Sequence, residues 1–325
     1  MHSQHYYNYK RLGIVAPLLL LLTLIVSACG TSGSSKNSNQ SQNNHQNEPQ
    51  NETRTITTIN GDVEIPVHPQ RIVADQYLGS FIALDIIPVG VPSLYWNNPY
   101  VVDSLDSVED LGDLTSSLEK MVDLKPDLIV SGLKADDNRY EQLSKIAPTV
   151  NIPFGELKNA HEELTYFGKL LGKEKEAEAW LANYDRRITA ARESVEKVVP
   201  AGSTFSIIEV YGKSIYVYGD NFGRGGQAVY QALGLKPPAS IAEEILEKQW
   251  VELSKEVLPQ YAGDYIILTT NDRTLEDIQA DPIWSTLDAV KNNRVYVWKE
   301  ERSWYFDPIA VLSQTEELAA WLTGQ

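Results

Sequence analysis

The sequence is nearly devoid of cysteine: Cys29 is the only one among 325 residues. A single thiol cannot form a disulfide within the chain or build a zinc site from several cysteines. If that thiol is itself modified, none remains for nucleophilic catalysis. Disulfides, thiolate chemistry and cysteine-based metal sites are therefore excluded.

Histidine and methionine are also scarce in the part of the chain that is expected to fold. Only His68, in an expected extended loop, and His161, on an expected helix, lie there, and Met121 is the one methionine beyond residue 28. A carrier of free zinc or manganese needs clusters of His, Asp and Glu, so the sequence argues against one. A haem carrier uses His, Met or Tyr as an axial ligand; tyrosine ligation stays open but is not favoured.

Signatures of catalysis and of nucleic-acid binding are missing as well. The chain has no G-x-S-x-G elbow and no phosphate-binding loop. The acidic pairs Asp136-Asp137 and Glu243-Glu244 are interpreted as solvated surface, since adjacent side chains point in different directions. A secreted hydrolase with a scattered triad remains the alternative of another class. The net charge of −16 argues against nucleic acid and anionic membrane surfaces as partners.

What the sequence does contain begins with a leader. Lys10 and Arg11 precede an apolar run that extends to Val26. The run is about 15 residues long, too short for a comfortable membrane span of ~20. The segment Leu24-Ile25-Val26-Ser27-Ala28-Cys29-Gly30 resembles a bacterial lipobox. Residues 1–28 are therefore expected to be a signal peptide and Cys29 to be lipidated, with an ordinary signal peptide or a short anchor as the alternative.

A polar tether follows, over residues 29–54. From Thr31 to Thr53, 15 of 23 residues are Ser, Asn or Gln. Such a segment buries too little apolar surface to offset the entropy of ordering it, so it is expected to be a disordered spacer. The protein is thus expected on the extracytoplasmic face of a cell membrane, in a single-membrane bacterium, with folding that starts near Arg54.

The remaining chain repeats one pattern in two halves. Short apolar runs rich in β-formers alternate with amphipathic segments, which predicts an α/β fold of two Rossmann-like lobes with mainly parallel sheets. Strands are expected at 71–74, 87–91, 127–131, 148–152, 204–210, 215–218, 265–269 and 295–298. Helices are expected around Phe81 and Leu84 and at 118–124, 138–146, 227–233, 282–286 and 309–322.

A long helical pattern separates the halves. Apolar residues recur at steps of three and four from Ala177 to Val198, and Pro200 ends the run. We expect one spine helix over Glu174–Val198, about 37 Å long. The predicted domains are a first lobe (55–172), the spine (173–199) and a second lobe (200–325), with a ligand cleft between the lobes and limited relative motion.

Three segments resemble iron–siderophore binding proteins of ABC transporters. They are residues 118–130 (LEKMVDLKPDLIV), 219–226 (GDNFGRGG) and 251–258 (VELSKEVL), and their order and spacing agree along the chain from about Thr55. The resemblance implies a binding protein without enzymatic activity that captures a ferric siderophore and delivers it to a permease dimer with a cytoplasmic ATPase. It implies no cofactor, with ferric iron present only inside the siderophore, and a monomer is expected.

The second lobe supplies the most specific ligand candidates. Tyr216 and Phe222 lie near Arg224, at a strand end and in a glycine-rich turn before a helix. Glycines allow close backbone approach, and an arginine fork suits carboxylate or hydroxamate oxygens. In the family this arginine typically faces the ligand. The plain alternative is a turn arginine paired with Asp220, with the aromatic rings filling the core.

Other candidates follow strand ends, where open α/β sheets bind ligands. After the strand at 295–298 come Arg302, Trp304 and Tyr305; Arg302 supplies a second cation unless it pairs with Glu300 or Glu301. For each first-lobe candidate, the alternative to a ligand contact is that the side chain only caps the edge of the sheet. These candidates are Tyr77, Trp96, Lys134 and Phe154.

Two glutamates have a different expected role. Glu119 begins the first-lobe helix, and Glu256 lies in the matching second-lobe segment. In the family, glutamates at these positions dock on permease arginines, one per lobe. Acidic residues near helix starts are also common simply because they favour the helix dipole.

The ligand class depends on charge and aromatic content. With Arg224 as the one cation expected in the cleft, a hydroxamate-type ferric siderophore is favoured over a triscatecholate. Hydroxamate-binding relatives often carry Trp where this chain has Phe222, which weakens the assignment. Ferric citrate or a citrate-hydroxamate is the alternative, particularly if Arg302 and Lys134 face inward.

Overall fold

The structure, a computed structural model, describes residues 52–113, 115–134 and 137–324. The predicted leader, the lipidation site Cys29 and nearly all of the tether lie outside these residues. The first strand, β1 (Thr53–Thr58), begins next to the predicted start at Arg54 and pairs with β2 (Gly61–Pro66) in an antiparallel hairpin. The hairpin was not predicted, and Ile65 anchors it in the first-lobe core.

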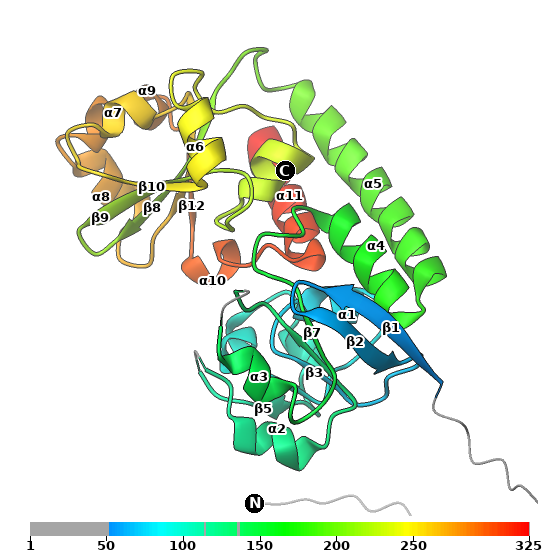
Figure 1. The fold of residues 1–325 in the computed structure, drawn as a ribbon. Helices are drawn as coiled ribbons and strands as arrows, with labels where there is room; N and C mark the ends of the chain where they lie inside the picture. Colours follow the sequence, from blue (N-terminus) through cyan, green and yellow to red (C-terminus); the bar gives the residue numbers. More distant parts are fainter. Residues whose placement is uncertain (1–51, 114, 135–136, 325) are drawn as a thin grey trace, which may run out of the picture. The chain divides into compact units, whose positions relative to one another are not determined.

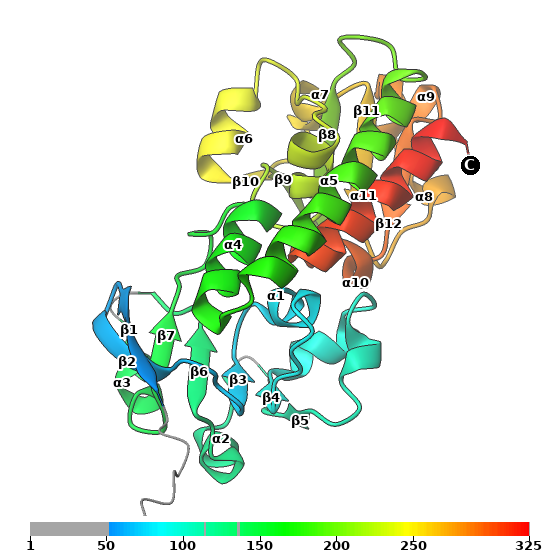
Figure 2. The ribbon, with the colours of Figure 1, turned by 90° about the vertical axis from the view of Figure 1, so that its right-hand side faces the viewer.

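The first sheet, in the lower lobe of Figure 1, is entirely parallel, as predicted. Its strand order is β5-β4-β3-β6-β7, and Figure 2 labels all five strands. Its strands are β3 (Ile72–Ala74), β4 (Gly90–Val91), β5 (Glu109–Asp110), β6 (Leu128–Ser131) and β7 (Thr149–Asn151). Gly90 allows α2 (Leu118–Leu124) to approach β4, because a Cβ there would lie 2.6 Å from Leu124 Cδ1.

The second sheet is mixed, with the order β10-β9-β8-β11-β12. Its strands are β8 (Phe205–Tyr211), β9 (Ser214–Tyr218), β10 (Trp250–Leu253), β11 (Tyr265–Thr269) and β12 (Val295–Trp298). β8, β11 and β12 are parallel, whereas β9 and β10 run antiparallel. The reversal follows from the tight turn between Tyr211 and Ser214, where Gly212 has φ of 59°. The α/β class is confirmed, with antiparallel pairing confined to one edge of this sheet.

Three long helices lie side by side: α4 (Ala160–Leu171), α5 (Glu174–Glu196) and α11 (Pro308–Thr323) (Figure 2). α5 is the predicted spine and ends two residues earlier than expected. Its first turns place Ala177 and Leu181 in the first-lobe core, and its last turns place Ala191 and Val195 in the second-lobe core. One helix therefore belongs to both cores.

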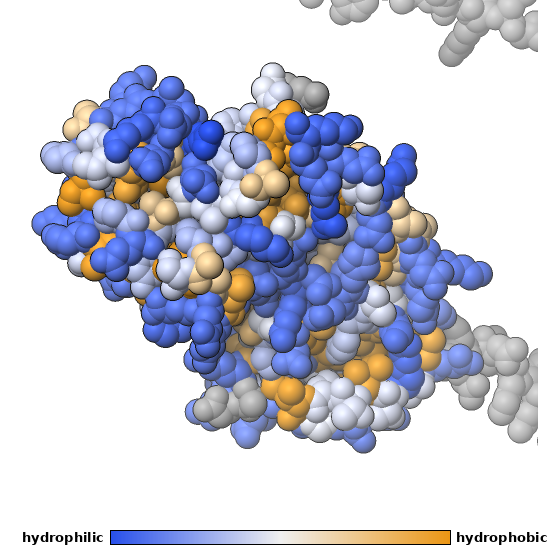
Figure 3. Space-filling view, turned by 90° about the horizontal axis from the view of Figure 1, so that it is seen from above, coloured by the Kyte–Doolittle hydropathy of each residue, from blue (hydrophilic) through white to orange (hydrophobic). Residues whose placement is uncertain are grey.

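The other helical elements are short. They are α1 (Leu78–Ala83), η1 (Ser93–Asn97), η2 (Val102–Ser104), α3 (Arg139–Leu143), the π-helix η3 (Gln227–Ala232), α6 (Ala242–Lys248), α7 (Leu258–Tyr261), α8 (Leu275–Ala280), η4 (Trp284–Thr286), α9 (Asp288–Lys291) and α10 (Glu300–Ser303). No helix within the described residues is both long and apolar enough to cross a bilayer. The face seen from above is mostly hydrophilic, with hydrophobic residues in small separate groups (Figure 3).

The segment before α11 holds the two lobes together. Tyr305 donates from its hydroxyl to the carbonyl of Leu94 at 2.7 Å, and Tyr100 donates to the carbonyl of Arg302 at 2.9 Å. Gly79 on α1 lies directly against Asp307, since a Cβ there would be 2.1 Å from Asp307 Oδ1. These contacts bring first-lobe strand ends next to the start of α11.

Candidate functional site

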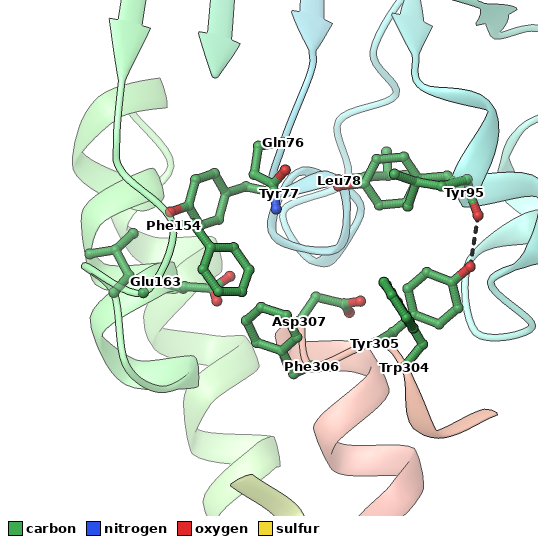
Figure 4. A pocket seen from close by; sticks show the side chains of 13 residues that line it. Gln76, Tyr77, Leu78, Tyr95, Phe154, Glu163, Trp304, Tyr305, Phe306 and Asp307 are labelled. Carbon is green, nitrogen blue, oxygen red and sulfur yellow. Dashed lines mark hydrogen bonds between the residues drawn. The ribbon is translucent and has the colours of Figure 1, made fainter. Parts of the chain in front are cut away.

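A cavity of about 240 Å³ opens where α1, α4 and the loop after β7 meet the segment before α11 (Figure 4). The first lobe contributes Gln76, Tyr77, Leu78, Leu94, Tyr95, Phe154, Gly155, Leu157 and Glu163; the second contributes Trp304, Tyr305, Phe306 and Asp307. Four of the side chains predicted to face a ligand are among them: Tyr77, Phe154, Trp304 and Tyr305. The walls are mainly aromatic.

Tyr77 forms one wall and also braces the first lobe. It caps α1 with a left-handed φ of 66°, a conformation uncommon outside glycine. Its hydroxyl donates to the carbonyls of Ile152 and Pro153 at 3.1 and 3.2 Å, and its ring lies 5.4 Å from that of Phe167. Burial raises the pKa of the Tyr77 phenol, so it stays neutral.

Three phenylalanines connect the lobes. The ring of Phe154, after β7, lies edge-on 5.6 Å from that of Phe222 and 5.3 Å from that of Phe306. Edge-to-face pairs at such distances are favourable. Phe154 is still 46% exposed, so part of its surface is available to a ligand.

Phe222 and Phe154 also border a second hollow, of about 560 Å³. Its other lining residues are Gly155, Lys158, Asp220, Asn221, Gln231, Leu246, Glu247, Lys248, Gln249 and Trp250. Because Phe154 and Gly155 line both, the two hollows adjoin at these residues. Together they form a groove larger than the first cavity alone.

Arg224 is buried beneath the cavity wall and does not line it. Its Nε lies 2.9 Å from Glu209 Oε1 and its Nη2 lies 3.2 Å from Oε2, so the partner is Glu209 and not Asp220. Trp304 covers the guanidinium, with 3.9 Å between the Arg224 Cζ and the ring centroid. Nη1 of Arg224 has no hydrogen bond within the described residues. Glu209 neutralises the charge of the guanidinium, but the N–H groups of Nη1 are not used as donors.

The glycines around Arg224 allow close packing against other segments of the same chain. A Cβ on Gly223 would lie 2.4 Å from the carbonyl oxygen of Trp304, and one on Gly225 would lie 2.5 Å from the ring of Trp298. The glycine-rich turn is thus required for the close approach of the 302–306 segment, whatever it does for a ligand.

The remaining predicted residues lie away from the cavity. Tyr216 is half-buried on β9 against Trp250, with 5.9 Å between ring centroids. Trp96 packs on the first-lobe core, while its neighbour Tyr95 turns toward the cavity. Lys134 is exposed and is not among the lining residues of either hollow.

Arg302 has a partner that the sequence did not suggest. Its Nη2 lies 2.5 Å from Glu317 Oε2 on α11, and neither Glu300 nor Glu301 pairs with it. The ion pair raises the pKa of the arginine and, with two further donors, lowers that of Glu317. The condition that favoured citrate, an inward-facing Arg302, is not met in this structure.

Two acidic residues of the cavity escaped the sequence reasoning. Glu163, on the first turn of α4, is 2% exposed and accepts a hydrogen bond from Ser80 Oγ at 2.6 Å. Burial, together with the negative charge of Asp307, raises its pKa to about 8. Nothing in the run Glu162-Glu163 distinguishes it from a surface glutamate.

Asp307 caps α11. Its Oδ1 accepts hydrogen bonds from the backbone N–H groups of Ile309 and Ala310 at 3.1 and 3.0 Å, and Asn98 Nδ2 lies 3.4 Å from its Oδ2. Burial raises the pKa of this carboxyl. The dipeptide Asp307-Pro308 is a recognisable helix start, which identifies the cap but not its place in a cavity.

The two glutamates expected to dock are both on the surface. Glu119 is exposed on the first turn of α2, and Glu256 is exposed between β10 and α7. Hydrogen bonds from the backbone N–H of Glu256 itself and from Ser254 lower the pKa of the Glu256 carboxyl, so this side chain is ionised at neutral pH. Across the described residues, no three His, Cys, Asp or Glu side chains converge to form a metal site.

Two α/β lobes on a shared helix, with an aromatic groove where they meet, define a two-lobed binding protein. A family model described as "Periplasmic binding protein" matches residues 72–302. This is more than half of the chain, and the chain therefore belongs to the periplasmic binding protein family.

Individual relatives show which members of the family the chain is similar to. The chain is 37% identical over 310 residues to the iron(3+)-hydroxamate-binding protein YxeB of Bacillus subtilis, covering 93% of this chain and 94% of that one. It is 38% identical to the iron(3+)-hydroxamate-binding protein FhuD of the same organism, covering 97% and 98%. The structure of FhuD2 from Staphylococcus aureus with bound ferrioxamine B superposes with a TM-score of 0.71 at 27% identity, covering 79% of this chain and 99% of that one.

Proposed function

We propose that the protein captures a ferric hydroxamate siderophore outside the cell and delivers it to an ABC permease. The observation that carries this is the aromatic groove between the lobes, whose inner cavity presents neutral and acidic groups and no arginine or lysine. A ferric trihydroxamate core carries no net charge. A groove whose inner cavity lacks cations, and whose second hollow balances Lys158 and Lys248 with Asp220 and Glu247, suits it. Relatives named for iron(3+)-hydroxamate binding, at 37 and 38% identity, support the same ligand class.

Anionic iron complexes fit the groove less well. Ferric citrate and triscatecholates need unneutralised cations, whereas Arg224 pairs with Glu209 and Arg302 with Glu317. Lys158 and Lys248 border the second hollow, but Asp220 and Glu247 line it as well. A multiply charged anion at the inner end of the cavity would be repelled by the charge of Asp307 and would meet no cation there.

The mechanism is capture without chemistry. Aromatic side chains from both lobes enclose apolar parts of the ligand, and Arg224, buried beneath the cavity wall, holds the ring of Trp304 in place. Because α5 belongs to both cores, only modest closure accompanies binding. The siderophore leaves chemically unchanged, and iron is held by the siderophore alone.

Delivery completes the proposal. Glu119 and Glu256, one on each lobe, dock on a permease dimer whose ATPase drives uptake. Lipidation of Cys29 holds a monomer on the extracytoplasmic face of the membrane, and the Ser/Asn/Gln tether separates the lobes from the bilayer.

Titration of tryptophan fluorescence tests the function. The compact unit from Pro49 onward contains both sheets and is titrated with ferrichrome, ferrioxamine B, ferric citrate and a ferric triscatecholate. Iron-free ligands and haem serve as controls. Saturable quenching by the ferric hydroxamates alone is expected. Quenching by ferric citrate or the triscatecholate alone would show that the protein binds that ligand class instead. Recovery of a chemically altered ligand would overturn the proposal that the protein only binds its ligand.

A further inference from the structure

The inner end of the cavity is acidic, and its two carboxylates differ in how well they are satisfied. Asp307 already accepts two backbone hydrogen bonds and faces Asn98. Glu163 accepts one, from Ser80 to Oε2, and its Oε1 has no hydrogen bond within the described residues. Figure 4 shows both carboxylates turned toward the space between α1, α4 and α11. Glu163 is therefore a buried acid with an unused oxygen that lines a cavity.

No positive side chain balances this end. The lining residues include no Lys, Arg or His. The nearest arginines identified above are committed elsewhere, Arg224 to Glu209 and Arg302 to Glu317. The groups that interact electrostatically with Glu163 are Ser80, Asp307, Tyr77 and Tyr95, and none of them is cationic. A buried carboxylate without a partner is costly.

We infer that Glu163 is a subsite for a cationic group of the ligand, a primary ammonium at the end of an alkyl arm of the siderophore. This inference rests on the proposed function. An ammonium group supplies donors for the unused Glu163 oxygen and opposes the charge of Asp307, in a charge-assisted hydrogen bond. The protein then selects ferric hydroxamates that carry a free amine over neutral ones.

The dimensions of the cavity support an arm and not a whole ligand. At about 240 Å³ the cavity is below the ~300–1,000 Å³ of typical ligand pockets. Leu78 and Leu157 line it with the aromatic side chains, which suits a methylene chain. The bulky iron centre would remain outside, over Phe154 and Phe222, where the second hollow adjoins.

A matched pair of ligands tests the subsite. Ferrioxamine B ends in a primary ammonium, and its N-acetylated form is neutral there but otherwise the same. Dissociation constants are measured for both, with the wild-type protein, Glu163→Gln and Glu162→Gln. Glu162 is the exposed neighbour on the same helix turn and serves as the control.

The wild-type protein should bind the amine form at least about tenfold more tightly. Glu163→Gln should remove this preference by weakening the amine form alone, and Glu162→Gln should retain it. Equal binding of both forms by the wild type overturns the inference while the proposed function stands, and so does a preference that survives in Glu163→Gln. If neither form binds but ferrichrome does, the inference is overturned and the proposed function stands; if ferrichrome fails as well, the proposed function itself is overturned.

A second measurement does not depend on folding of the variant. Calorimetry of the wild-type protein at pH 7, in buffers of different ionisation enthalpy, counts protons released on binding. Close to one proton should leave Glu163 when the amine form binds, since its pKa is raised to about 8 in the free protein. The acetylated form should release none. The same proton count for both ligands would contradict the subsite.

Discussion

The ring of Trp304 lies over the guanidinium of Arg224, with 3.9 Å between the arginine Cζ and the ring centroid. One face of the tryptophan is thus occupied by a cation that Glu209 already neutralises, while 44% of the side chain remains exposed. Cation–π contact fixes the ring orientation. Arg224 positions Trp304, and Trp304 presents its outer surface to the cavity.

Arg224→Ala should therefore act on stability before it acts on affinity. The change leaves Glu209 buried without its partner, and breaking such a pair costs about 3–5 kcal/mol of unfolding free energy. Denaturant unfolding measures the loss. Replacing both partners, with Glu209→Gln and Arg224→Met together, should cost less than Arg224→Ala alone. If Arg224→Ala keeps full stability and loses only ligand affinity, the arginine acts as a ligand contact.

Trp304→Ala should lower affinity for a ferric hydroxamate about tenfold or more, since one large aromatic wall is lost. Because the side chain is well exposed, the unfolding free energy should change little. Trp304→Phe should recover much of the affinity but lose part of the fluorescence quenching. Tyr211→Ala, at a 67% exposed aromatic outside both hollows, is the control and should bind normally. Equal affinity of Trp304→Ala and the wild type would remove Trp304 from the site.

Gly79→Ala should separate the lobes at the start of α11. The new Cβ would lie 2.1, 2.3 and 2.5 Å from Oδ1, Cγ and Cβ of Asp307, and overpacking of this kind costs about 1–3 kcal/mol. Adding Asp307→Gly removes all three atoms and keeps a tolerated helix cap. The double variant should be more stable than the sum of the single effects predicts, as a thermodynamic cycle would show. Strict additivity would argue that the clash is relieved elsewhere.

Glu163 should make stability depend on pH. Its pKa is about 8 in the folded protein against an ordinary 4.5, so between these values the unfolded chain ionises while the folded chain keeps the proton. The unfolding free energy therefore falls as pH rises through that window and levels off above it, by an amount on the order of a few kcal/mol.

Unfolding curves of the wild type and Glu163→Gln between pH 4 and 9 isolate this contribution. The difference between the two proteins should shift in favour of Glu163→Gln as pH rises toward 8. Parallel pH profiles would show that Glu163 is already ionised in the folded protein.

The proposed docking role of Glu119 and Glu256 is tested by a transport measurement. Glu119→Arg and Glu256→Arg should leave siderophore affinity unchanged, because neither side chain lines either hollow. Iron uptake by cells that depend on this protein should fall sharply in either variant and further in the double variant. Glu178→Arg, another exposed glutamate on α5, is the control. Normal uptake by the double variant would assign docking to other residues.

Most of the sheets could be predicted because their strands are short apolar runs bounded by proline, glycine or charge. β3, β6, β8, β11 and β12 lie within a residue of their predicted bounds. The β1–β2 hairpin escaped because its strands are rich in Thr and only half-buried. α4 was expected only as a helix that contains His161; its bounds, marked by the cap Asn159 and by Gly172 at its end, were not predicted.

Residues of the site could be predicted only where their position next to a strand end in the sequence was enough to place them. Tyr77, Phe154 and Trp304 follow strand ends, and that position alone places them near the groove. The partners of Arg224 and Arg302 are Glu209 and Glu317, each fifteen residues away along the chain, and only the folded sheet and helix bring them together. Local charge spacing suggested Asp220, Glu300 and Glu301 instead.

The spine helix has a consequence for how the protein fails under stress. Since α5 contributes side chains to both cores, neither lobe can lose its helix without exposing the core of the other. The two lobes should melt in a single transition, and hydrogen exchange along α5 should report the global unfolding free energy at both ends. In the extracytoplasmic setting proposed above, proteases would therefore find no partly unfolded lobe at which to begin cleavage.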